Sequence, residues 1–140
     1  MKRLLTSILF VLAAICMSAQ NASTEFARKL AALPGVSDVK QLEVGKNTEF
    51  SEKFVIKVQQ NVDGDTSEKG TFGQRVVIGF VGYDKPTVLV TEGYYADYAF
   101  NPNYTEELCQ LFKANLVFCE YRYFGESTPV PTNWDYMTVD

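Results

Sequence analysis

Alternating apolar and polar positions near the middle of the chain predict two strands joined by a turn. In residues 50–59 apolar side chains alternate with more polar ones, which is typical of a strand with one buried face. Residues 71–81 predict a second strand, and the apolar run 76–78 within it indicates burial on both faces. The polar stretch 61–70 between them carries an Asp-Gly-Asp sequence, a common turn signal. We therefore expect an antiparallel pair of strands.

A strand, a helix and a second strand follow the antiparallel pair after a predicted tight turn. Residues 87–91 and 116–121 are short apolar runs of strand character. Asn103 has the position of a helix cap, with Glu106 as its capping-box partner, and Asn115 marks the end of the helix. The helix would carry one apolar stripe, formed by Leu108, Leu111 and Phe112. This order predicts a βαβ unit, so we expect an α/β fold in which antiparallel strands lead into a parallel sheet.

The segment before the sheet is predicted to hold one short helix. Residues 20–33 have apolar positions at helical spacing, and Pro34-Gly35 would stop the helix. Residues 36–48 alternate weakly, so a linker and an irregular strand both remain open. We therefore divide residues 20–140 into an N-terminal helix and linker, 20–49, and a sheet domain, 50–140.

Residues 1–19 have the composition of a cleavable signal peptide. Two basic residues precede the apolar run 4–15, and small residues ending at Ala19 follow it. The run is too short for a transmembrane helix, which takes about 20 apolar residues. We expect cleavage after Ala19 and a secreted or periplasmic protein without a transmembrane segment. The alternative is a lipoprotein acylated at Cys16.

Composition and charge exclude several classes of function. The net charge of -4 argues against a nucleic acid or an anionic membrane surface as partner, because both need a basic surface. The chain contains no histidine, so neither a Ser-His-Asp nor a Cys-His catalytic group can form from it. Histidine-bearing zinc sites are excluded for the same reason. We expect no catalytic residue, no metal site and no cofactor in this chain.

Two cysteines remain after the predicted cleavage, Cys109 on the predicted helix and Cys119 on a predicted buried strand. An oxidising compartment would allow them to pair. We favour two free thiols that behave as small buried apolar side chains, and a disulfide remains the alternative. Two thiols alone cannot form an all-cysteine zinc site.

A resemblance to a known family begins in the last third of the chain. Residues 120–127, EYRYFGES, resemble the loop after the fourth strand of α/β-hydrolases, where an acidic residue, an arginine, a glycine and a serine recur at these offsets. The tyrosine-rich form is similar to secreted serine peptidases of the tripeptidyl aminopeptidase family and, more distantly, to lysosomal prolyl carboxypeptidase relatives. Segments 70–76, 91–94 and 134–138 resemble further parts of that family in the same order. The resemblance covers residues 50–140 and implies the N-terminal part of an α/β-hydrolase sheet.

The resemblance implies an exported serine peptidase that releases short peptides from a free N-terminus. The family's serine lies on an elbow after the fifth strand, followed by an aspartate and a histidine. We therefore expect all three beyond residue 140, and the truncated chain to be inactive alone. Gly93 and Tyr94 fall where a backbone N–H in the loop after the third strand forms part of the oxyanion hole. One departure is at Asp63, which Gly64 follows where family members tend to carry an Asp-His pair.

Several residues in the last third have both a functional and a structural interpretation. Glu120 and Glu126 could form a carboxylate pair for acid–base catalysis, although we expect Glu120 to fix the following loop through hydrogen bonds. We expect Arg122 to brace a loop. Ser127 is not expected to be a nucleophile, because it has neither an elbow nor a base. The aromatic residues in 94–100 could line a substrate pocket, but packing is the interpretation we favour.

A second function remains open, that of a small exported binding module derived from a hydrolase scaffold. Such a module would stabilise an open sheet edge by pairing with a second copy of itself. In the peptidase interpretation the partner is instead a peptide substrate of the full-length enzyme.

Overall fold

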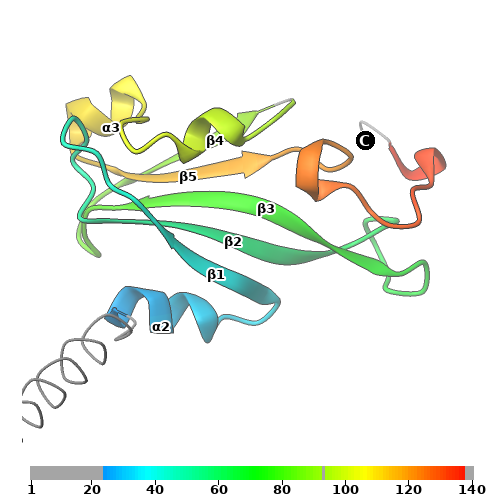
Figure 1. Ribbon diagram of the computed structural model, residues 1–140. Coiled ribbons are helices and arrows are strands. Elements are labelled where there is room, and N and C mark those ends of the chain that lie inside the picture. Colours follow the sequence, from blue (N-terminus) through cyan, green and yellow to red (C-terminus); the bar gives the residue numbers. More distant parts are fainter. Residues whose placement is uncertain (1–23, 93, 138–140) are drawn as a thin grey trace, which may run out of the picture.

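One five-stranded sheet organises the computed structural model, which describes residues 24–92 and 94–137 (Figure 1). Its strands are β1 (Val36–Leu42), β2 (Glu52–Asn61), β3 (Thr71–Phe80), β4 (Thr87–Glu92) and β5 (Asn115–Glu120). Two α-helices, α2 (Glu25–Ala31) and α3 (Glu107–Phe112), accompany them, with 3₁₀ turns at Asp97–Phe100, Gly125–Ser127 and Trp134–Tyr136. The predicted signal peptide 1–19, its cleavage site after Ala19 and Cys16 lie outside the described residues.

The predicted antiparallel pair is confirmed as β2 and β3. The two strands pair without a break from Glu52 opposite Phe80 to Asn61 opposite Thr71. In the connecting loop the Asp63 carboxylate accepts hydrogen bonds from the backbone N–H groups of Asp65 and Thr66, at 3.2 and 2.9 Å, which closes the turn. The apolar run 76–78 is buried on both faces of the sheet, as its lack of alternation predicts.

Residues 36–48, for which the sequence allows either a linker or an irregular strand, contain the irregular strand β1. β1 pairs antiparallel with β2, and its register shifts between Ser37 and Lys40. Asp38, inside that bulge, has a φ of 53°, a left-handed conformation that aspartate tolerates better than most residues. The bulge interrupts the alternation of side chains, and so it weakens the sequence signal for this strand.

The predicted βαβ unit is present, with a strand order that the sequence does not show. β5 pairs parallel with β4 and antiparallel with β3, and it therefore lies between them. The turn after β3 consequently joins two strands that are not neighbours. The Asn115 side chain stabilises this connection, because its Oδ1 accepts from the N–H groups of Val81 and Gly82 at 2.7 and 3.1 Å.

The predicted limits of the second helix are wrong at both ends. Glu106, not Asn103, occupies the N-cap position of α3, and its side chain makes no capping hydrogen bond. The Asn103 side chain instead accepts a hydrogen bond from the distant Asn47 N–H at 3.4 Å. The residues before the helix form a turn instead, in which the Tyr104 N–H donates to the Asn101 carbonyl at 2.9 Å. At the other end Lys113, with a φ of 48°, ends the helix, and Asn115 is instead the first residue of β5.

The two faces of the sheet carry separate cores. Helix α2 lies against one face, and α3 lies on the opposite side (Figure 1). The α2 side buries Ala27, Leu30, Phe54, Ile56, Val76 and Ile78. The α3 side buries Phe50, Val77, Ala96, Ala99, Cys109, Leu116 and Phe118. No helix in the described part of the chain is both long and apolar enough to cross a membrane.

The two described cysteines belong to different cores. Cys109 is part of the α3 side, whereas Cys119 packs against the α2 side. Both are free thiols. The expectation of two free, largely buried thiols is therefore confirmed, and the alternative of a disulfide is wrong, because the sheet separates the two side chains.

A chain that starts at Gln20 should consequently contain two protected thiols. Burial raises the pKa of Cys109 and of Cys119, which lowers the fraction of reactive thiolate. We expect a chromogenic disulfide reagent to label almost no thiol under native conditions and both thiols after denaturation in guanidinium chloride. Absence of both thiols from the denatured, unreduced protein would contradict this assignment.

Candidate functional site

The carboxyl ends of β4 and β5 define the candidate site. The two strands are parallel, so they end at the same edge of the sheet, and the loops that follow them start there (Figure 1). Ligands of α/β sheets bind outside the carboxyl ends of parallel strands. Two of the four segments that carry the sequence resemblance, 91–94 and 120–127, start at the ends of these strands.

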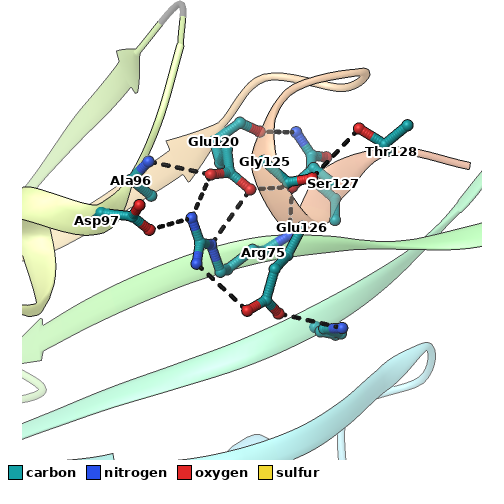
Figure 2. Close-up of polar contacts among 10 residues, drawn as sticks. Arg75, Ala96, Asp97, Glu120, Gly125, Glu126, Ser127 and Thr128 are labelled. Carbon is teal, nitrogen blue, oxygen red and sulfur yellow. Dashed lines mark hydrogen bonds and ion pairs between the residues drawn. The ribbon is translucent and has the colours of Figure 1, made fainter.

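Glu120, the last residue of β5, forms the centre of this edge. Its side chain is 0% exposed. Its carboxylate accepts hydrogen bonds from the Ala96 N–H at 3.0 Å and from the Ser127 hydroxyl at 2.8 Å (Figure 2). The Arg75 guanidinium donates two more, from Nε at 3.2 Å and from Nη2. One carboxylate therefore joins β3, the loop after β4 and the loop after β5.

Sheet register explains why Arg75 and Glu120 meet. Val77 on β3 lies opposite Phe118 on β5, and both side chains are in the core on the α3 side. Arg75 precedes Val77 by two residues and Glu120 follows Phe118 by two. Because side chains alternate with a period of two along strands, both charged groups point to the same face and are neighbours across the two strands.

Arg75 extends the network to two further carboxylates. Nη2 contacts Asp97 Oδ1 at 2.8 Å, and Nη1 lies 3.6 Å from Glu126 Oε1 (Figure 2). Burial alone would lower the pKa of Arg75, but hydrogen bonds and charge attraction from Glu120 and Asp97 outweigh it and raise that pKa above its ordinary value. Arg75 is thus a permanent buried cation at this edge.

Ser127 completes the contacts of Glu120. The side chain is buried, and its Oγ accepts from the Arg75 N–H at 2.9 Å while donating to Glu120. The nearby Gly125 has a φ of 48°, and a Cβ there would collide with the Glu120 carboxylate. The expectation that Glu120 fixes the loop that follows it is therefore confirmed. The Ser127 hydroxyl both donates and accepts a hydrogen bond in this arrangement.

The alternative of a catalytic Glu120–Glu126 pair has no support in this geometry. Glu120 has no solvent-exposed surface and its two oxygens accept four hydrogen bonds. Glu126 is exposed and lies 3.4 Å from the ammonium group of Lys57. A carboxylate so enclosed cannot reach a substrate to transfer a proton.

Arg122 braces a loop, as expected. Its Nη2 donates to the carbonyl of Asn61 at 3.3 Å and to that of Val62. The guanidinium also lies over the Phe72 ring, 5.6 Å from its centroid. Arg122 therefore ties the segment after β5 to the distant β2–β3 hairpin.

The two oxyanion-hole candidates are not both visible. Gly93 lies outside the described residues. Tyr94 has a side chain that is 68% exposed, and its ring meets Phe124 edge-on at 5.4 Å between centroids. No hydrogen bond among residues 24–92 and 94–137 takes up the Tyr94 N–H. The role of both residues in the oxyanion hole stays a prediction.

The aromatic residues of 94–100 divide into two groups. Tyr98 packs edge-on against Phe118 at 5.3 Å, and Phe100 lies under the Arg75 guanidinium at 5.1 Å. Tyr94 and Tyr95 are exposed beside the carboxyl ends of β4 and β5. Packing therefore accounts for the second half of this segment, while the first half presents aromatic surface to solvent.

Lys53 is a buried residue of this region that the sequence analysis missed. Its Nζ donates to the Asn101 carbonyl at 2.8 Å and lies 5.8 Å from the centroid of the Tyr104 ring. Burial lowers the pKa of Lys53 to about 8. Lys53 therefore anchors the far end of the loop that follows β4. Lys53 lies on the face of the strand where apolar and polar residues mix. From the sequence alone, a lysine there cannot be distinguished from one whose ammonium group is in solvent.

The contacts at this edge hold two loops in place. No group of three His, Cys, Asp or Glu side chains that could hold a metal ion occurs among the described residues. A cavity of about 250 Å³ opens beside the network over β1, β2 and β3. Its polar wall includes Lys40, Lys57, Arg75 and Glu126.

Comparison with known proteins gives the family context of this edge. The model of the family described as PS-10 peptidase S37 matches residues 19–140. A prolyl tri/tetrapeptidyl aminopeptidase from Streptomyces mobaraensis is 35% identical over 86 residues, which are 61% of this chain and 17% of that protein. The chain thus spans less than a fifth of the length of this curated relative.

The buried Lys53 predicts a specific pH dependence of stability. The pKa of Lys53 falls from 10.5 to about 8 on folding, so between these pH values the unfolded chain binds the additional proton. Its burial therefore opposes folding fully below about pH 8, and this opposition disappears as the pH rises to 10.5. Relative to Lys53→Met, the free energy of unfolding of the wild type should rise by about 2–3 kcal/mol over this range. Urea titrations at several pH values measure the difference, and a difference that stays constant would contradict the assignment.

Proposed function

The chain belongs to the peptidase S37 family, and from this premise we propose that it forms the N-terminal part of an exported serine aminopeptidase. The enzyme would release short peptides from the free N-terminus of a peptide substrate. The family match over residues 19–140 supports a peptidase, and the name of the Streptomyces mobaraensis relative supports cleavage of tri- and tetrapeptides from an N-terminus. The signal peptide proposed for residues 1–19 supports export.

The observation that carries the proposal is the junction of two loops at the carboxyl ends of β4 and β5. Glu120 holds Ala96 in one loop and Ser127 in the other. We assign to the first loop the backbone N–H groups of Gly93 and Tyr94 as oxyanion donors. Removing one such donor typically lowers kcat by about 100- to 1,000-fold, so a fixed loop at this place has catalytic value without a side-chain role.

The sheet supports an α/β-hydrolase scaffold for this enzyme. Antiparallel strands β1 to β3 precede the parallel unit β4–α3–β5, as the resemblance implies. We propose that these strands are the N-terminal half of the hydrolase sheet. The nucleophile, the acid and the histidine would come from further residues of the enzyme, since these 140 residues include no histidine.

Exposed apolar surface supports the presence of further structure around this half-sheet. Leu89 on the edge strand β4 is 62% exposed. The apolar side chains of α3, predicted as one stripe, also face solvent: Leu108, Leu111 and Phe112. Parallel strands are normally covered on both faces, so we propose that additional strands and helices of the same enzyme pack here.

A second candidate function rests on the edge strand alone. β4 pairs with β5 and is the last strand of the described sheet, which leaves its outer edge open. A small exported binding module could close this edge by pairing with a second copy. Sedimentation of a chain that starts at Gln20 separates the two candidates, because only the module requires a defined dimer.

A first test of the peptidase proposal is the reading frame beyond the codon for Asp140. We expect the transcript to continue into a G-x-S-x-G elbow followed by an aspartate and a histidine. The product of that longer frame should hydrolyse tripeptide amides and lose this activity with a serine-directed inhibitor. A stop codon directly after Asp140 in the transcript would overturn the proposal in favour of the binding module.

The 140-residue chain itself should show no peptidase activity. Without a histidine, no serine in it can be activated by the general base that this mechanism uses. We expect no release of product from tripeptide amides above the enzyme-free blank. The aminopeptidase from Streptomyces mobaraensis serves as a positive control, and inhibitor-sensitive hydrolysis by the short chain would contradict the assignment of the catalytic residues to other parts of the enzyme.

A further inference from the structure

The Glu120 carboxylate contacts the backbone of the loop after β4 close to its start. Its Oε1 accepts from the Ala96 N–H at 3.0 Å and from Arg75 Nη2, while Oε2 accepts from Arg75 Nε and the Ser127 hydroxyl (Figure 2). Ala96 itself is fully buried. The loop is therefore held by its main chain and not only by an exposed side chain.

A second contact reinforces the first at the next residue. Arg75 Nη2 bridges Glu120 and Asp97, and the Asp97 Oδ1 lies 2.8 Å away. Glu120 thus acts on the loop directly at Ala96 and, through the arginine it orients, at Asp97. The Asp97 side chain is mostly exposed, so the backbone contact at Ala96 is the better protected of the two.

The spacing of the anchors leaves little freedom to the residues between them. β4 ends at Glu92, and the next fixed point is Ala96. Only residues 93–95 lie between the sheet and this contact. Because a short connection has few conformations once both of its ends are fixed, the position of Ala96 restricts the backbone at Tyr94 and Tyr95.

We propose that Glu120 is a positioning residue of the peptidase: its buried carboxylate fixes the Ala96 N–H and thereby sets the backbone of Tyr94. The last step rests on the proposed function, which assigns an oxyanion donor to Tyr94. A carboxylate is required because all four groups around it are donors. Glutamine has the same shape but replaces one acceptor oxygen with a donor NH₂ group, which would face a donor here.

Amide measurements on a chain that starts at Gln20 test the positioning step directly. In the wild type the Ala96 amide should be protected from hydrogen exchange, and the Tyr94 amide should have an order parameter near that of rigid backbone, about 0.85. In Glu120→Gln the Ala96 amide should exchange at least about tenfold faster, and the order parameter of Tyr94 should fall below about 0.6. The amides of Val77 and Phe118 should keep their protection in both proteins.

Two variants separate positioning from a general loss of structure. Ser127→Ala removes the arm of Glu120 to the other loop, and it should leave Ala96 and Tyr94 unchanged. Ala96→Pro removes the N–H and places the ring Cδ where the proton met Glu120 Oε1, so it breaks this contact from the side of the loop, and the φ of Ala96, -83°, is close to that of proline. It should lower the order parameter of Tyr94 as Glu120→Gln does, and it gives the test if Glu120→Gln fails to fold.

The proposal is overturned if Tyr94 stays rigid in Ala96→Pro, or if Ser127→Ala loosens Tyr94 as much as Glu120→Gln does. In the complete peptidase, Glu120→Gln should lower kcat by about 10- to 100-fold and leave KM nearly unchanged, since the oxyanion forms only during the reaction. A loosened Tyr94 with unchanged kcat would refute the oxyanion assignment of the proposed function and leave Glu120 as the anchor of the loop.

Discussion

The buried ion pair between Arg75 and Glu120 is the interaction on which the carboxyl edge of this sheet depends. Two charges removed from water are tolerated only when the remaining donors and acceptors are also satisfied. Here the carboxylate accepts four hydrogen bonds, and the guanidinium reaches Asp97 and Glu126 as well. Removing one partner of such a pair typically costs about 3–5 kcal/mol. The loops that supply Ala96 and Ser127 therefore provide hydrogen-bond donors that replace water around this buried pair.

This arrangement follows from the order of the strands. Because β5 lies between β3 and β4, its last residue is beside Arg75 on one side and beside the end of β4 on the other. A strand order in which β4 paired with β3 would separate the arginine from Glu120. The Asn115 side chain contributes to this order at the opposite end of β5, where it bonds the backbone of the turn after β3.

Local patterns in the sequence predict most of the strands and both helices. They do not predict the contacts that these strands and helices make with one another. The alternation in 50–59 and the apolar runs in 71–81 and 116–121 predict strands because burial of side chains fixes these periods. The bulge in β1 hides a strand, and a turn before α3 replaces the predicted Asn103 cap, since both depend on distant partners. The structural role of Glu120 could be predicted, but its partner Arg75 lies 45 residues away in sequence. Lys53 has no local signal at all, because only tertiary structure buries it.

The polar and the apolar side chains of the described residues differ in one respect. The charged groups around Glu120 have partners within the sheet, whereas several large apolar side chains are exposed to solvent. The charged groups around Glu120 find their partners within residues 57–127, so the contacts that hold the two loops lie inside the described sheet. Leu89 of β4 and the apolar residues Leu108, Leu111 and Phe112 of α3 face solvent. A scaffold that fixes loop geometry by itself, and buries its outer surface only against further structure, can set the backbone donors of a reaction without holding its nucleophile. One part of the enzyme would then position the groups that contact the transition state, and another part would carry out the proton transfer.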